Sequence, residues 1–368
     1  MVLRTLELFN FRNYEHLDIE FSPHRNLAIG RNAQGKSNLL ESIYFLSYLR
    51  SKRARTLADL VREGHEEASV LGSIIGDGSE ARVRLTVGAR GRTAEVNGQK
   101  VGSSARVRGR MKCVSFDPDD LCLVKGEPGR KSGFLDETLE ALGPMGAVAI
   151  NQYGHALRQR NAILKVWERY GTGLEDAIGP WSRGLATYGA KMVASRLEML
   201  RTMEEVVERL YREISQDEKK VELRYAGTFG LEDASEGEIF ENMQRALDSV
   251  LVEEKRERAT RVGPHRDDVE IRLGGRDARY KASQAELRTL AFCMRLAQKE
   301  HVERKTGQTP VILFDDVLSE LDEGRRRRVL DLAGGESQAM LTATEATADM
   351  KRASDKTLVV DGGMISIG

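Results

Sequence analysis

The segment GRNAQGKS at residues 30–37 constrains the fold more than any other feature of the chain. It follows a short apolar run, NLAI at residues 26–29, and opens a run with helical apolar spacing, SNLLESIYFLSYL. A strand, a glycine-rich loop and a helix in this order form a phosphate cradle, because the N–H groups of the loop and the helix N-terminus point at the anion. The segment therefore predicts a nucleotide-binding α/β domain. The alternative is a glycine-rich turn before an ordinary helix.

Residue types within this loop indicate separate tasks in holding ATP and Mg²⁺. Glycines let backbone N–H groups close around phosphate oxygens. Lys36 supplies a positive charge to the β- and γ-phosphates, and Ser37 offers a hydroxyl to Mg²⁺.

A second signal is VILFDDVLSELD at residues 311–322. Four apolar residues that end in Asp315 and Asp316 predict a buried strand with two carboxylates at its C-terminal edge, where ligands of parallel sheets bind. Successive strand residues point to opposite sides, so the two carboxylates need different tasks. We assign Asp315 to the Mg²⁺ hydration shell and Asp316 to orienting the attacking water. The alternative is an Asp pair that only caps the following turn.

The two halves of this predicted site lie near opposite ends of the chain, with a helical insertion between them. That separation is typical of the ATP-binding-cassette (ABC) heads of SMC-type DNA-repair ATPases. In such heads a serine-rich segment upstream of the second acidic strand caps the γ-phosphate held by a second copy. Ser283, in YKASQAELRTLAF, occupies this place.

Apolar periodicity divides the chain into segments of different character. Period-two alternation predicts strands in the first 30 residues and an antiparallel sheet within residues 69–101. From about Leu121 to Arg258 the pattern is helical, with apolar residues spaced by three or four between Val193 and Ile214. We expect an α/β fold of the ABC type, in which a mixed P-loop sheet and an antiparallel β-subdomain form a head at residues 1–120 and 260–368. A helical arm at residues 121–259 is inserted into it.

Composition sets limits on partners and compartment. The charge is balanced, with 57 Lys and Arg against 57 Asp and Glu, so any nucleic-acid binding requires local basic patches. Three cysteines form no C-x-x-C pair, which favours a reducing cytoplasm. No apolar run reaches the roughly 18 residues of a membrane span, and the N-terminus lacks a secretory leader pattern, so we expect no membrane association.

Six blocks in chain order resemble the RecF family of bacterial recombination-repair ATPases: LELFNFRNYEHLDIEF, GRNAQGKSNLLESIYFLS, FDPDDLCLVKGEPGRKSGFLD, GPHRDDVEI, ASQAELRTLAF and VILFDDVLSELD. The resemblance covers nearly the whole chain. It implies an ATP-dependent homodimer that binds double-stranded and gapped DNA at single-strand gaps and junctions. It also implies work with RecR and RecO to help load RecA, with weak ATP hydrolysis as a switch.

The same resemblance assigns residues to the nucleotide. Arg12 and Asn13 match an N-terminal loop that contacts phosphate and base, and Thr344 matches a position that senses the γ-phosphate. The remaining residues that it places at ATP lie in and directly after the phosphate loop: Gly30, Arg31, Asn32, Ala33, Gln34, Gly35, Lys36, Ser37 and Asn38.

Two departures from the family pattern stand out. Ala285 replaces the glycine that relatives carry two residues after the serine. No glutamine lies near VSFDPDD, where many ABC heads have one that touches Mg²⁺, so that contact is unassigned.

Two basic runs have competing interpretations. LRSKRARTL at residues 49–57 is compatible with contacts to DNA phosphates, with the adenine side of the nucleotide, or with a solvated loop. The four consecutive arginines at 325–328 spread around a helix, which favours a solvated surface.

Two other function classes stay open at this level, besides an SMC-like ATPase with another repair role. A P-loop phosphotransferase acting on a small molecule would show ATP turnover stimulated by a metabolite and indifferent to DNA. A DNA-binding module with a silent nucleotide site would keep its DNA affinity after Lys36→Arg or Asp316→Asn. The split motif and Ser283 favour the ATP-gated DNA-binding dimer.

Overall fold

The computed structural model describes residues 1–76, 78–89, 91–102, 106–231, 234–335 and 337–368. The chain forms two units. The first contains residues 1–120, 210–217 and 288–368, and the second contains residues 121–209 and 218–287.

A mixed six-stranded sheet forms the centre of the first unit, with the order β15-β14-β3-β13-β12-β8. Five strands run parallel and only β15 is antiparallel. The strands are β3 (Arg25–Ile29), β8 (Cys113–Phe116), β12 (Val311–Asp315), β13 (Ala339–Ala343), β14 (Lys356–Asp361) and β15 (Met364–Ile367). The predicted strand VILFD is β12, whose four apolar residues are buried as expected for a strand covered on both faces.

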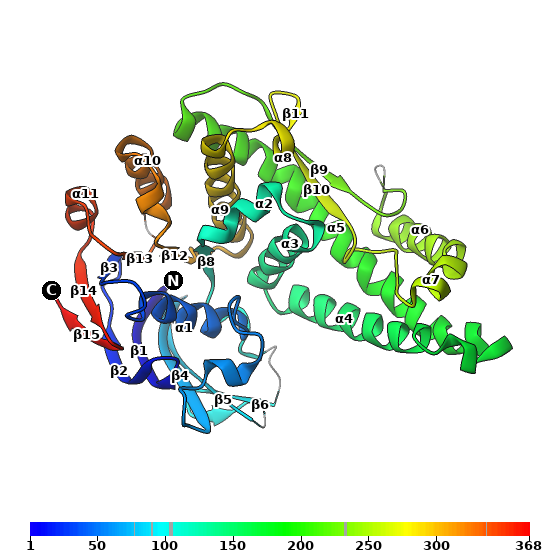
Figure 1. Ribbon diagram of the computed structural model, residues 1–368, viewed down its shortest axis with the longest axis horizontal. Helices are drawn as coiled ribbons and strands as arrows, with labels where there is room; N and C mark the ends of the chain where they lie inside the picture. The colour runs from blue at the N-terminus through cyan, green and yellow to red at the C-terminus, as the bar shows by residue number, and fades with distance from the viewer. Residues whose placement is uncertain (77, 90, 103–105, 232–233, 336) are drawn as a thin grey trace. The chain divides into compact units, whose positions relative to one another are not determined.

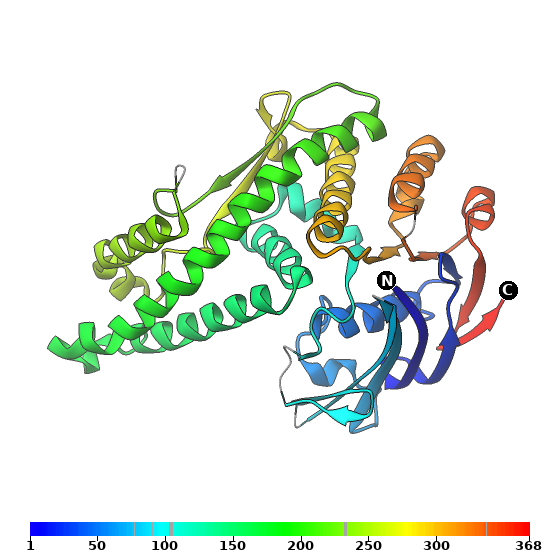
Figure 2. The same ribbon diagram turned by 180° about the vertical axis from the view of Figure 1, so that it is seen from behind.

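A second, antiparallel sheet has the order β2-β1-β4-β5-β6-β7 and is drawn in blue to cyan in Figure 2. Its strands are β1 (Val2–Phe11), β2 (Tyr14–Glu20), β4 (Glu67–Gly76), β5 (Ser79–Gly88), β6 (Gly91–Val96) and β7 (Gln99–Lys100). The sequence predicts two separate groups of strands. The structure joins them because β1 pairs with β2 on one side and with β4 on the other.

Helices complete the first unit. They are α1 (Lys36–Tyr48), most of α9 (Gln284–Thr306), α10 (Glu323–Ala333) and α11 (Ala348–Arg352). Most of α1 is buried, and the helix contacts β4 of the antiparallel sheet and β12 and β13 of the mixed sheet. The phosphate-loop helix is therefore fixed by both sheets.

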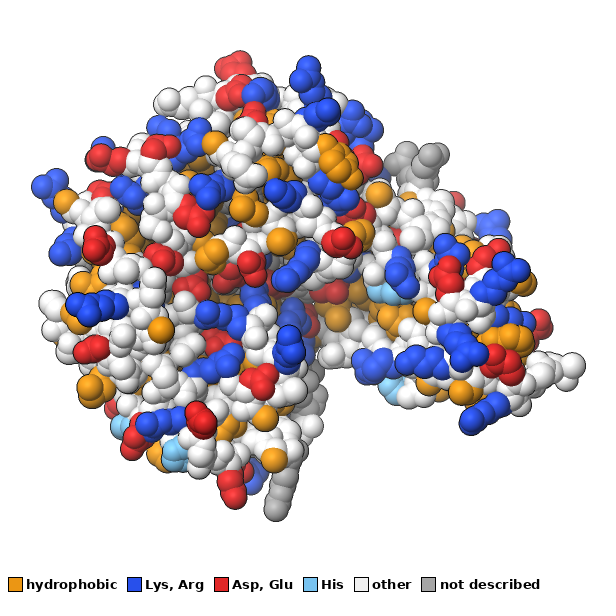
Figure 3. All heavy atoms as spheres, in the orientation of Figure 1, with side chains coloured by type: hydrophobic (Ala, Val, Ile, Leu, Met, Phe, Trp, Pro, Cys, Tyr) orange, Lys and Arg blue, Asp and Glu red, His pale blue; other side chains and the backbone are white. Residues whose placement is uncertain are grey.

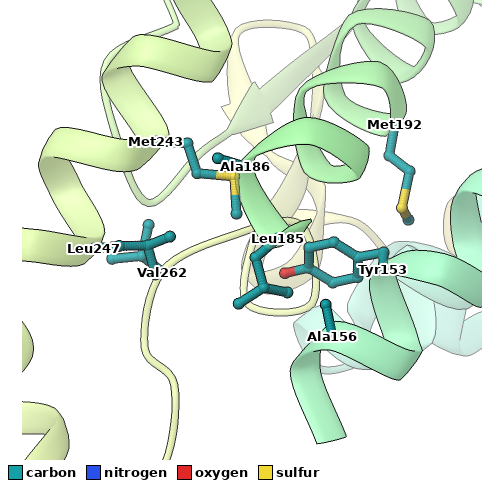
Figure 4. Packing of buried hydrophobic residues seen from close by; sticks show 8 residues of the cluster. All are labelled: Tyr153, Ala156, Leu185, Ala186, Met192, Met243, Leu247 and Val262. Atoms are coloured by element: carbon teal, nitrogen blue, oxygen red, sulfur yellow. The ribbon is translucent and has the colours of Figure 1, made fainter. Parts of the chain in front are cut away.

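The second unit is mainly helical, as its apolar spacing predicts. Its helices are α2 (Cys122–Lys125), α3 (Pro128–Leu142), α4 (Pro144–Leu164), α5 (Leu174–Ser215), α6 (Glu236–Ser249), α7 (Leu251–Glu257) and α8 (Ala278–Lys281). Tyr153 and Ala156 of α4 pack with Leu185 and Ala186 of α5 and with Met243 of α6 (Figure 4). The predicted stripe on α5 is part of the core, with Val193, Met203 and Val207 fully buried.

The division into units differs from the predicted boundaries in two places. Strand β9 (Val221–Ala226) interrupts the predicted helical region, although VELRYA has a period-two pattern. It pairs with β10 (Asp268–Leu273), which also pairs with β11 (Arg276–Asp277). Residues 260–287 therefore belong to the second unit rather than to the head. The reason is that β10 forms its backbone hydrogen bonds with β9, which lies in the second unit. The C-terminal turn of α5 belongs to the first unit, where Arg328 Nε donates to the Ile214 carbonyl at 3.2 Å.

None of the helices in the described residues is long and apolar enough to span a bilayer.

Candidate nucleotide-binding site

The predicted site residues of the first unit gather at one edge of the mixed sheet. Strands β3, β13, β12 and β8 are parallel neighbours, so their C-terminal ends meet at the same edge. The phosphate loop follows β3, Thr344 follows β13, and Asp315 ends β12. This is the edge at which open α/β sheets bind their ligands.

Two glycines give the phosphate loop its shape. A Cβ on Gly30 would lie 2.2 Å from the carbonyl oxygen of Val360, so only glycine fits between β3 and β14. Gly35 has φ +119°, a region that glycine reaches without steric cost. Ala33 has φ +66°, an uncommon value for a residue with a Cβ and the kind of strain that collects at functional sites.

Hydrogen bonds from the β1–β2 turn and the β14–β15 turn hold the loop in place. Asn13 Nδ2 and the Gly363 N–H donate to the Gln34 carbonyl at 2.8 and 3.0 Å. The Tyr14 hydroxyl donates to the Gly35 carbonyl at 3.0 Å, and Asn38 Nδ2 donates to Asn13 Oδ1 at 2.8 Å. Asn13 and Asn38, both predicted as nucleotide contacts, lie beside the loop and brace it.

Lys36 lies inside the curve of the loop. Its Nζ donates to the carbonyls of Gly30 and Arg31 at 2.6 and 2.9 Å. Burial lowers the pKa of Lys36, while the charges of Asp316 and Asp315 raise it. The ammonium is thus desolvated and close to where a bound phosphate would add negative charge.

Ser37 and Asp315 meet although they come from opposite ends of the chain. The Ser37 hydroxyl donates to Asp315 Oδ1 at 2.7 Å, and Thr342 Oγ1 donates to the same oxygen at 3.1 Å. Burial raises the pKa of Asp315, the hydrogen bond from Ser37 lowers it, and the charge of Asp117 raises it again. A hydroxyl and a desolvated carboxylate form an all-oxygen donor pair, which fits Mg²⁺ better than softer metals.

Asp316 lies one residue beyond β12 in a left-handed conformation, with φ +57°. Its N–H donates to Thr342 Oγ1 at 2.9 Å, and Ser319 Oγ donates to its carbonyl at 2.6 Å. These bonds hold a strained backbone, and the charge of Asp316, like that of Asp315, acts on Lys36.

Thr344 contacts the phosphate loop directly. Its hydroxyl donates to Asn32 Oδ1 at 3.0 Å, so the end of β13 and the loop are joined by one side-chain bond.

Arg12, predicted to contact the nucleotide, is held by contacts within the protein. Its guanidinium donates to both carboxylate oxygens of Glu41 at 2.8 and 2.7 Å and to the Asp59 carbonyl at 2.6 Å. Glu41 is buried on α1. The bidentate pair links the β1–β2 turn to the helix that follows the phosphate loop.

Asp117 is a site residue that sequence reasoning missed. Phe116 pairs in register with Phe314, so Asp117 follows β8 just as Asp315 ends β12. Burial raises the pKa of Asp117, but the charges of Lys52 and Arg295 outweigh it and leave the pKa lowered. An apolar strand that ends in Asp, CVSFD, was the available signal.

The basic stretch after α1 lies beside these carboxylates. Lys52 Nζ pairs with Asp117 at 2.7 Å, and Arg53 Nη1 lies 4.0 Å from Asp315 Oδ2. These two cations therefore face the acidic edge of the site, which none of the sequence-based interpretations anticipated.

The arginine run at 325–328 is held within the protein's own contacts. Arg325 pairs with Asp322, Arg327 with Glu323, and Arg328 donates to the Ile214 carbonyl. Arg326 Nε bonds Asp349 at 2.8 Å.

Ser283 lies in the second unit and directly precedes α9. Its Oγ accepts from the Glu286 N–H at 3.3 Å, and its own N–H donates to Glu286 Oε2 at 2.7 Å. This capping box joins Ser283 and Glu286, so the serine side chain is engaged within its own chain. A hydrogen bond from Lys219, then those from Ser283, lower the pKa of Glu286 to about 2. Ser283, Gln284 and Ala285 are exposed.

The sequence and the fold are both similar to known proteins. The chain matches the RecF/RecN/SMC N-terminal domain family over residues 2–361. It is 35% identical over 368 residues to the DNA replication and repair protein RecF of Pelotomaculum thermopropionicum, with 100% of both chains covered. The chain belongs to the RecF family. The RecF protein of Symbiobacterium thermophilum is 36% identical over 350 residues, covering 94% of this chain and 92% of its own.

A RecF structure described as the recombination mediator protein RecF-ATP in the RecFOR pathway has a TM-score of 0.91. It is 32% identical and covers 100% of this chain and 97% of its own. The Smc head bound to the C-winged helix domain of ScpA, at 17% identity and TM-score 0.58, shares the fold, with 100% and 98% covered. The predicted fold class, an ABC-type head with an inserted helical part, is confirmed.

Proposed function

We propose that this protein is an ATP-dependent DNA-binding protein of recombinational repair and replication-fork recovery, acting in the cytoplasm. Its similar relatives are named DNA replication and repair proteins, and a similar solved structure is described as RecF-ATP. One observation of the chain itself carries the nucleotide part of the proposal. Ser37 and Asp315 hydrogen-bond at 2.7 Å, close to the desolvated Lys36. Residues from both ends of the chain thus form one site that suits a phosphate group and its bound cation.

The chain's residues divide the work of binding nucleotide. Loop N–H groups and Lys36 bind the β- and γ-phosphates, because the loop is shaped by Gly30 and Gly35 to bring its backbone close to them. Ser37 and Asp315 would hold Mg²⁺. Bound Mg²⁺ supplies positive charge that neutralises the phosphate oxygens. Asp316, which follows β12 with a left-handed backbone and whose charge acts on Lys36, orients the attacking water of a weak, DNA-stimulated hydrolysis.

Ser283 completes the site of a second copy in this proposal. It is exposed and caps the N-terminus of α9, where the end of a helix favours an anion such as a γ-phosphate held by another chain. ATP would therefore close a homodimer and hydrolysis would release it. We propose that the closed dimer binds DNA at single-strand gaps and double-strand junctions, and helps RecR and RecO to load RecA.

The test is DNA binding measured against nucleotide and salt together. We expect a gapped duplex to bind in Mg-ATP several-fold or more tightly than in Mg-ADP, with an affinity that falls steeply with salt. ATP turnover stimulated by a metabolite and indifferent to DNA would contradict the proposal and favour a phosphotransferase. Equal DNA affinity in ATP, in ADP and in Asp316→Asn would favour a silent nucleotide site.

Replacing Ala285 by glycine tests the position that departs from relatives. A glycine lets the backbone approach phosphate more closely than an alanine does, because it lacks the Cβ. We expect Ala285→Gly to tighten the ATP-bound dimer by roughly threefold to tenfold, or about 0.6 to 1.4 kcal/mol. Sedimentation velocity across a protein concentration series measures this change. Ala282→Gly, the same substitution outside α9, is the matched control, and an equal effect of both would show that position 285 does not approach the nucleotide.

A further inference from the structure

Helix α4 (Pro144–Leu164) has an unusual composition for this chain. The whole protein has 57 Asp and Glu among 368 residues, but the 21 residues of α4 contain none. Every other described helix longer than four residues contains at least one carboxylate. A solvated helix surface normally mixes both signs of charge, so the absence of one sign along five turns needs a cause.

The two faces of α4 have separate roles. Tyr153, Ala156 and Leu164 are buried, and the first two pack into the core of the second unit (Figure 4). Arg160 is also buried, where it pairs with Glu254 at 2.7 Å. None of these side chains is available to a partner. Packing in the core therefore does not explain which residues occupy the opposite, exposed face of α4.

From Asn151 onward the exposed face is a row of polar and basic side chains, whereas Met145 and Val148, near the start of the helix, are exposed apolar residues. Its members lie one to six residues apart and continue one residue past the helix: Asn151, Gln152, His155, Arg158, Gln159 and Lys165. Figure 3 shows Lys, Arg and His side chains over the surface where α4 runs in Figure 1. Between Asn151 and Lys165, a stretch described in full, the only exposed apolar side chain is Ala162.

The dimensions of the row fit a nucleic-acid duplex. At 1.5 Å per residue the row is about 21 Å long, enough to cross a major groove of about 12 Å and reach phosphates on both sides. Arg158 and Lys165 provide cations that pair with no carboxylate among the described residues. The amides of Asn151, Gln152 and Gln159 donate to phosphate oxygens and to base edges alike. An acidic protein would satisfy the cations but would not need a row of amides almost free of apolar side chains.

We propose that the exposed face of α4 contacts the phosphate backbone of duplex DNA. This inference rests on the proposed function, because that function makes DNA the ligand, and the inference places the DNA on the second unit. The absence of carboxylates on α4 then follows from the cost of holding one against a phosphate.

The experiment is a salt titration of binding to a fluorescently labelled, mixed-sequence DNA duplex, followed by anisotropy in Mg-ATP with the full-length protein. We expect Arg158→Ala/Lys165→Ala to weaken binding by about tenfold or more near 0.1 M salt. The log–log slope against salt should fall in magnitude by about 2. Gln159→Glu should also weaken binding, because it adds a carboxylate to the row.

The matched control removes the same charge elsewhere in the second unit. Arg245 and Arg256 are exposed on α6 and α7, and Arg245→Ala/Arg256→Ala should leave the slope within experimental error of the unaltered protein. Thermal unfolding and Mg-ATP affinity should be the same in all variants, which separates a surface effect from misfolding.

Three outcomes contradict the inference in distinguishable ways. If the unaltered protein binds DNA and the α4 double variant has an equal slope, α4 is not the contact and the proposed function stands. If both double variants lower the slope equally, the effect is one of net charge. If the unaltered protein binds no DNA in Mg-ATP, the proposed function fails and this inference fails with it.

Discussion

Lys36→Ala is expected to weaken ATP binding by roughly 30-fold to several thousand-fold, which corresponds to about 2 to 5 kcal/mol. The Lys36 ammonium is already desolvated and held by two carbonyls of the loop at 2.6 and 2.9 Å. These hydrogen bonds offset the desolvation of the ammonium, so its positive charge is already positioned before ATP binds. Isothermal titration calorimetry with Mg-ATP measures the loss.

Lys112→Ala is the matched control for this variant. Lys112 is also buried, and its Nζ donates to the Gly109 carbonyl at 2.9 Å, but the residue precedes β8 at the opposite end of that strand from Asp117. We expect Lys112→Ala to lower stability and to leave ATP affinity within about twofold. Retention of ATP affinity in Lys36→Ala would contradict the assignment of this loop to phosphate.

Arg160→Met is expected to destabilise the second unit by about 3 to 5 kcal/mol. Arg160 and Glu254 form an ion pair at 2.7 Å, and their side chains are 1% and 0% exposed. Glu254 Oε1 also accepts from the Arg261 N–H at 2.7 Å, so the pair fixes the segment that follows α7. Removing the guanidinium leaves a buried carboxylate without its counter-charge. Urea unfolding followed by circular dichroism measures the change in free energy of unfolding.

Two further variants make this prediction specific. Arg160→Met/Glu254→Leu should recover much of the loss, because no uncompensated charge stays buried. Arg258→Met removes an exposed pair with Glu168, in which the side chains are 57% and 50% exposed, and should cost less than about 1 kcal/mol. If Arg160→Met cost no more than Arg258→Met, the buried pair would not hold the unit together.

Local sequence patterns predicted those parts of the site that depend on neighbours in sequence. The phosphate loop is specified by glycines beside an apolar strand, and Asp315 by its place at the end of four buried residues. Both signals are local because a strand and the turn after it are short-range structures. The parallel sheet then brings the two together, which follows from the rule that strand ends share an edge.

Features that depend on pairing between distant segments could not be predicted. The joining of β1 to β4 and the placement of residues 260–287 beside β9 are matters of register between strands far apart in the sequence. Periodicity specifies which face of a strand is apolar but not which strand lies beside it. The partners of Arg12 are of the same kind, since nothing in NFRNY indicates that Glu41 lies within reach.

Asp117 lies in the segment where the family pattern led us to expect a glutamine, and that Mg²⁺ contact stays unassigned. VSFDPDD contains no glutamine. The carboxylate of Asp117, directly after β8, is instead close enough to raise the pKa of Asp315. The edge of the site therefore carries more negative charge than Asp315 and Asp316 alone would give it. Lys52, which pairs with Asp117 at 2.7 Å, partly balances it.

The central claim is that ATP completes its site between two copies of this chain. The most direct test is molar mass in solution by light scattering, at saturating Mg-ATP and at saturating Mg-ADP, for the unaltered protein and for Ser283→Ala. We expect a dimer with ATP, a monomer with ADP, and a weakened ATP-bound dimer in Ser283→Ala with unchanged ATP affinity per chain. A monomer at saturating Mg-ATP would contradict the claim.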